Sequence, residues 1–101
     1  MDNNKLENGA FDKDLKHSSP PDWTQFVLTG VGEDLLALLQ KRVAVCLSSY
    51  RMAKTMEEVA KIQGEERMLV FTIQLIHGLA ELGRRQVARI SQEKEEVGTD
   101  A

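Results

Sequence analysis

The strongest constraint in this sequence is an apolar repeat of seven residues that runs through its second half. Its first and fourth positions each recur five times, and only Glu66 among them is neither apolar nor small. Spacings of three and four sustained in this way are typical of one long helix with a continuous seam. We therefore predict a helix over residues 55–96, roughly 60 Å long. The seam positions are Val59, Ile62, Glu66, Leu69, Ile73, Ile76, Ala80, Gly83, Val87 and Ile90.

A second amphipathic helix is predicted over residues 33–53, where apolar side chains recur every three or four residues. Thr55 and Glu58 have the spacing of a capping box, so Thr55 should cap the long helix. The very short connection between the two helices makes them antiparallel neighbours in a helical hairpin. The expected hairpin core consists of Leu35, Leu39, Val43, Cys46, Tyr50, Phe71 and Leu75.

A short helix should precede the hairpin. Asp22 and Gln25 form a variant of the capping box, which predicts a helix near residues 23–28. Gly30 and Gly32 should end that helix and bend the chain before the hairpin. The predicted fold is therefore all-α, with a flexible N-terminal arm at residues 1–21, a helical hairpin domain at 22–97 and a frayed C-terminus at 98–101.

The long helix predicts self-association. Its partner in the hairpin can cover only residues 56–76, so the rest overhangs unless the short helix folds back on it. Between residues 68 and 82 the helix is apolar on a second side as well, and a helix that is apolar nearly all round must be enclosed. We expect further copies of the chain to enclose it in a helical bundle or coiled coil. The expected oligomer interface is Leu69, Ile73, Ile76, Ala80, Gly83, Val87 and Ile90.

Composition argues against several classes of binding and catalytic function. With a net charge of −3 and a sequence pI of about 5.4, the chain lacks the overall positive charge that favours phosphate binding. The single cysteine, Cys46, has no partner for an internal disulfide. We expect no enzyme, since His17, His77 and Cys46 do not form a catalytic or metal-binding pattern. No cofactor is expected, nor is a membrane-spanning segment or a signal peptide. The predicted location is the cytoplasm or a virion.

Two segments are candidates for binding other molecules. Phe11 and Leu15 stand four residues apart in the polar arm, as on one face of a short helix, so the arm is a candidate for binding a larger protein. Arg84, Arg85 and Arg89 form a basic strip near the end of the long helix. A solvated surface is the favoured interpretation of this strip, and a nucleic-acid contact is the less favoured one.

One segment carries a resemblance to a known group of proteins. The run TMEEVAKIQGE at residues 55–65, followed by a hydrophobic helix, resembles a pattern found in short helical proteins encoded among the structural genes of tailed bacteriophages. The resemblance covers about a third of the chain. It implies a virion or assembly component present in many copies, and it supplies no catalytic residues.

The sequence therefore favours a non-enzymatic structural or assembly component that oligomerises through its long helix, with the arm holding a larger neighbour. The alternative is a small dimeric regulatory or nucleic-acid-associated protein that uses the arginine strip.

Overall fold

The structure, a computed structural model, describes residues 12–99, with side chains for residues 12–94. These residues form a short 3-10 turn, η1 (Asp12–Asp14), and three α-helices: α2 (Pro20–Leu28), α3 (Gly30–Ser49) and α4 (Met56–Thr99). Within residues 12–99 there is no strand, so the all-α prediction is confirmed. The chain is elongated, with extents of 70 × 33 × 23 Å.

Helix α2 begins earlier than the sequence predicted. Ser19 is its N-cap, and Pro20 and Pro21 occupy the first helical positions, where proline lacks only an amide hydrogen that the helix does not use. The Asp22 carboxylate accepts a hydrogen bond from the Ser19 amide at 2.9 Å. The prediction that Asp22 caps this helix was therefore wrong, because Asp22 is the third helical residue and reaches back to the cap.

The bend between α2 and α3 lies at Thr29, one residue before the predicted glycines. The Thr29 hydroxyl accepts a hydrogen bond from the Gly32 amide at 3.0 Å and so caps α3. Gly30 and Gly32 belong to the first turn of α3. A Cβ at Gly32 would stand 1.9 Å from the carbonyl oxygen of Phe26, so glycine here permits the tight passage from α2 to α3.

Helix α4 begins where the sequence predicted. The Thr55 hydroxyl accepts a hydrogen bond from the Glu58 amide at 3.1 Å, while the Glu58 carboxylate accepts one from the Lys54 amide at 2.7 Å. The helix continues without interruption through Gly64 and ends at Thr99, three residues beyond its predicted end.

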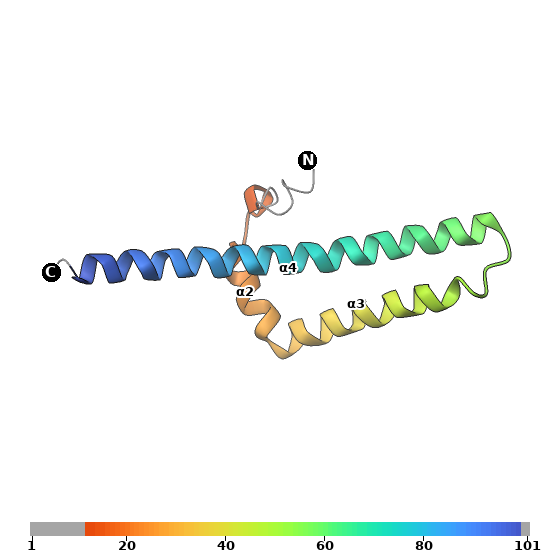
Figure 1. Cartoon of the computed structure of the whole chain (residues 1–101), viewed down its shortest axis with the longest axis horizontal. Helices are drawn as coiled ribbons and strands as arrows, with labels where there is room; N and C mark the ends of the chain where they lie inside the picture. Colours follow the sequence, from red (N-terminus) through yellow and green to blue (C-terminus); the bar gives the residue numbers. More distant parts are fainter. Residues whose placement is uncertain (1–11, 100–101) are drawn as a thin grey trace.

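The three helices are arranged around α4. Helix α3 runs antiparallel to the first half of α4, whereas α2 crosses α4 near its middle, and the turn η1 lies on the side of α4 away from α3 (Figure 1). The last turns of α4 extend beyond both neighbours. Little of this arrangement is enclosed: among residues 12–94 the buried apolar side chains are Pro20, Leu36, Cys46, Ile76, Leu79 and Ala80.

Candidate functional site

Helices α2 and α4 of one copy cross each other closely. The Thr24 hydroxyl of α2 donates a hydrogen bond of 2.6 Å to the carbonyl oxygen of Ala80. At Gly83 a Cβ would stand 2.3 Å from the Pro20 carbonyl oxygen, so only glycine lets the two backbones approach this closely. Gly78, by contrast, has open space around it. The short helix therefore folds back on the long one.

Because of this crossing, most of the predicted oligomer interface is not available to a second copy. Ile76, Ala80 and Gly83 are buried within one copy, and Leu69 and Ile73 are half-buried. Val87 and Ile90 are the exposed members of the set, at 48% and 52%.

The exposed end of α4 continues the buried face. At about 100° per residue, Val87 and Ile90 fall on the same side of the helix as Ile76 and Gly83. The apolar seam thus runs under α3 and α2 and then emerges beyond Gly83, where neither of these helices covers it. We refer to Val87 and Ile90 as the α4 seam end. It is the clearest candidate for contact with another chain.

Two polar links tie the hairpin together. Arg42 of α3 forms an ion pair with Glu65 of α4, and this contact raises the pKa of the arginine guanidinium. The Tyr50 hydroxyl donates a hydrogen bond of 2.7 Å to the carboxylate of Glu66, which raises the pKa of the tyrosine because the bond favours its protonated form. Glu66, the one charged residue of the apolar repeat, is thus held by a tyrosine hydroxyl.

The expected hairpin core is found in part. Cys46 is 2% exposed, and burial raises the pKa of its thiol. Leu39, Val43, Tyr50 and Leu75 are half-buried.

Two members of the expected core are exposed, namely Leu35 at 38% and Phe71 at 41%. They were placed in the core wrongly, because each lies on a flank of its helix and not at the centre of the contact. The central position of α3 belongs to Leu36, which is buried.

The basic strip is partly neutralised by its own helix. Arg84 and Arg85 both form ion pairs with Glu81, at 2.9 and 3.4 Å. All three arginines, Arg89 included, have exposed side chains. The arrangement is that of a solvated, internally paired surface, although it does not remove the net positive charge of this segment.

The proposed partner-binding arm is described only from Asp12 onward. Phe11 lies outside the described residues, and Leu15 follows η1 and is half-buried. The end of the predicted arm, residues 18–21, belongs to the fold, since Ser18 accepts a hydrogen bond of 3.1 Å from the Trp23 indole nitrogen and Ser19 caps α2. The Trp23 ring meets Phe26 edge-on, with centroids 6.1 Å apart.

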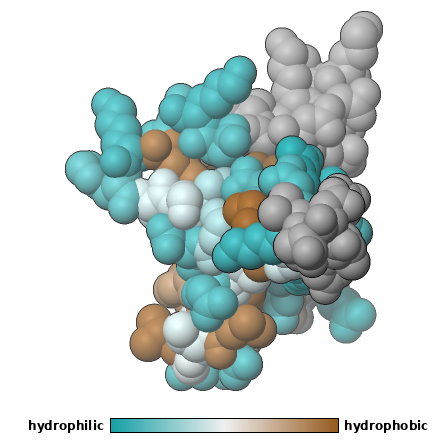
Figure 2. Space-filling view, turned by 90° about the vertical axis from the view of Figure 1, so that its left-hand side faces the viewer, coloured by the Kyte–Doolittle hydropathy of each residue, from teal (hydrophilic) through white to brown (hydrophobic). Residues whose placement is uncertain are grey.

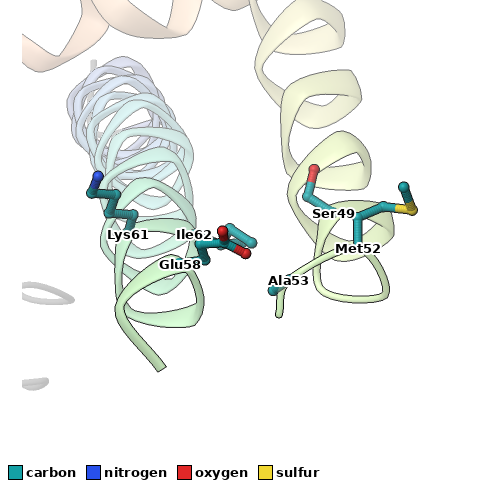
Figure 3. A pocket seen from close by; sticks show the side chains of 6 residues that line it. All are labelled: Ser49, Met52, Ala53, Glu58, Lys61 and Ile62. Atoms are coloured by element: carbon teal, nitrogen blue, oxygen red, sulfur yellow. The ribbon is translucent and has the colours of Figure 1, made fainter. Parts of the chain in front are cut away.

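An open hollow lies at the turn of the hairpin. It is lined by Ser49, Met52, Ala53, Glu58, Lys61 and Ile62. Figure 3 shows Glu58 and Ile62 pointing from α4 towards α3, whereas Met52 points away from α4. No signal in the sequence singled out this hollow, because it forms where the end of α3, the turn and the first turns of α4 come together.

The described residues contain no group of three His, Cys, Asp or Glu side chains placed to hold a metal ion. In that part of the chain, no helix combines the length and apolar character needed to cross a bilayer. No protein-family model, curated protein or solved structure matches the chain.

Proposed function

We propose that this chain is a structural or assembly component that associates with further copies of itself through the long helix α4. One observation carries the proposal: the face of α4 that α3 and α2 cover continues beyond them at Val87 and Ile90, which are 48% and 52% exposed. Water-exposed apolar side chains on the continuation of a buried seam are favourably covered by another apolar surface.

The small core agrees with this proposal. The three α-helices have 9, 20 and 44 residues, which is a marginal size for a monomer with one hydrophobic core, and few of the described side chains are enclosed. Association is a common source of additional stability for chains of this size. The resemblance of residues 55–65 to tailed-phage structural proteins suggests a virion as the setting, with the N-terminal arm contacting a larger neighbour.

The interface is tested by the double substitution Val87→Glu with Ile90→Glu. Covering the exposed half of each side chain contributes about 1 kcal/mol, or about 4 kcal/mol for a symmetric pair of chains. Losing that contribution weakens association by about 1000-fold. Ala88→Glu is the matched control, since Ala88 is also exposed on α4 but lies about 100° away from the seam.

Sedimentation velocity at several concentrations gives the readout. We expect the double variant to form smaller assemblies than the control while keeping the same helical circular dichroism. If the double variant and Ala88→Glu associate equally well, the α4 seam end is not the interface. Ile76→Asp does not serve this purpose, because Ile76 is buried inside one copy and the substitution would disturb the fold itself.

The assembly role has a separate test, for which the deletion must be chosen from the structure. Removing residues 1–21 would take away Ser19 and Pro20, which begin α2. Removing residues 1–11 spares the described fold. We expect the shorter deletion to leave self-association intact and to abolish incorporation into a larger assembly, as read by mass spectrometry of native complexes. Full incorporation without residues 1–11 would show that the arm is not the attachment point.

The alternative function, nucleic-acid binding by Arg84, Arg85 and Arg89, makes a different prediction. Six arginines from a pair of chains would give a slope of about −5 for log affinity against log salt. The pairing of Arg84 and Arg85 with Glu81 disfavours this function. Tight, steeply salt-dependent DNA binding that is lost when the three arginines become alanine would favour it over the structural role.

A further inference from the structure

A second apolar stripe runs along α3, separate from the face that meets α4. Val31, Leu38 and Val45 recur at intervals of seven, with Leu35 between the first two. All four are exposed: Val31 is 72%, Leu38 64%, Val45 40% and Leu35 38% exposed. We call these residues the α3 flank stripe. A spacing of seven with an intermediate apolar position is the pattern of a helix that packs against another helix.

The position of the stripe relative to α4 follows from Arg42. This residue continues the stripe between Leu38 and Val45, and its guanidinium pairs with Glu65 of α4. The stripe therefore lies along an edge of the hairpin where both helices are accessible. One turn after Glu65, α4 contributes Met68, which is 65% exposed, to the same face. Figure 2 shows apolar side chains at the surface at the level of α2 and α3.

We propose that the α3 flank stripe binds the same stripe of a second copy, with the two α3 helices antiparallel. The charges beside the stripe favour this occupant. Asp34 and Lys41 are both exposed and stand seven residues apart on its outer border. An antiparallel pairing that sets Leu35 of one copy opposite Leu38 of the other brings Asp34 of each copy next to Lys41 of the other. The ion pair is formed twice by symmetry.

The same register lets Arg42 lie in the contact without losing its ion pair. Its aliphatic stem covers Val31 of the second copy while its charge remains paired with Glu65 of its own chain. A parallel pairing would instead place the two Arg42 residues in one layer, where like charges repel. The antiparallel arrangement is therefore the one that fits the charges of this helix.

This contact is distinct from the α4 seam end and goes beyond the function proposed above. In an antiparallel pair the two α4 helices point their free ends in opposite directions. Each pair then carries an α4 seam end at both extremities. Contact through these ends would join pairs into a larger array, since a molecule with two separate self-contacts can extend an assembly.

The test starts from the Val87→Glu, Ile90→Glu background, in which only the α3 contact remains. At about 100 μM, a dissociation constant of about 1 μM leaves mostly dimer, so sedimentation should give twice the chain mass of 11.3 kDa. Adding Leu38→Glu should weaken this dimer about 100-fold, given the loss of two exposed leucines. The matched control Ala37→Glu, exposed on another side of α3, should not.

A charge exchange tests the antiparallel register. Asp34→Lys and Lys41→Asp should each weaken self-association, because each sets like charges opposite one another. A mixture of the two variants should form heterodimers, since one chain then carries a positive charge at both positions and the other a negative charge at both. Three results would each overturn the proposal. The background variant could stay monomeric at about 100 μM, the Leu38→Glu and Ala37→Glu forms could dimerise equally well, or the mixture could show no preference for heterodimers. Failure of the α4 proposal is seen separately, as an unchanged mass when Val87 and Ile90 are substituted.

Discussion

The crossing of α2 over α4 makes opposite predictions for two glycines in one helix. At Gly83 an added Cβ would stand 2.3 Å from the Pro20 carbonyl oxygen and 2.3 Å from the Thr24 hydroxyl. The first of these is backbone, so α2 must move away, and the Thr24 hydrogen bond to Ala80 is strained with it. At Gly78 nothing lies within 4 Å of the added atom.

The magnitudes follow from these contacts. Overpacking typically costs about 1–3 kcal/mol, and loss of one hydrogen bond costs about 1 kcal/mol. Replacing glycine by alanine inside a helix stabilises the helix by about 1 kcal/mol. We therefore expect Gly83→Ala to destabilise the protein by about 1–3 kcal/mol, whereas Gly78→Ala should stabilise it by about 1 kcal/mol.

Urea unfolding followed by circular dichroism, at one fixed protein concentration, measures both variants. The comparison is sharp because the same substitution is made twice in the same helix, and only the environment differs. If Gly83→Ala stabilises the protein as much as Gly78→Ala does, then α2 does not cross α4 at this position and the described fold is wrong there.

Three further predictions concern single contacts. Thr24→Val should lower the free energy of unfolding by about 1 kcal/mol, because it removes the hydrogen bond to Ala80; urea unfolding that matches wild type would contradict this. Tyr50→Phe should lower the urea midpoint, because Glu66 loses its hydrogen bond, and an unchanged midpoint would show that water replaces the tyrosine at no cost. The folded state favours the protonated Cys46 thiol, whose pKa is raised by burial, so stability present at neutral pH should decline as the pH rises above about 9. Cys46→Ala should flatten that decline, and an equally steep loss in this variant would assign it to other groups.

The sequence predicted those features that depend on neighbouring residues. The cap at Thr55, the hairpin turn and the continuity of α4 follow from spacings within a few residues or from one sustained repeat. The start of α2 was missed because two capping-box patterns overlap at Asp22: the predicted one joins Asp22 to Gln25, whereas the one that forms joins Ser19 to Asp22. Gly30 and Gly32 were read as breakers, whereas Thr29 supplies the cap that starts α3.

The contacts that define the candidate site were harder to predict because they join distant parts of the chain. Thr24 and Ala80 are 56 residues apart, and no periodicity shows that α2 will fold back on α4. Without that knowledge, Ala80 and Gly83 looked like contacts between copies. The α3 flank stripe was missed for a related reason: Leu35 was assigned to the hairpin core, and only the exposed fractions separate the two faces of α3.

Whether another copy covers the exposed seam of α4 is best tested by the mass of the unmodified chain in solution. Sedimentation equilibrium over a range of micromolar concentrations gives that mass without assuming a shape, which matters for a molecule this elongated. Self-association predicts an average mass above 11.3 kDa that falls towards that value on dilution. A mass of 11.3 kDa at every concentration would contradict it.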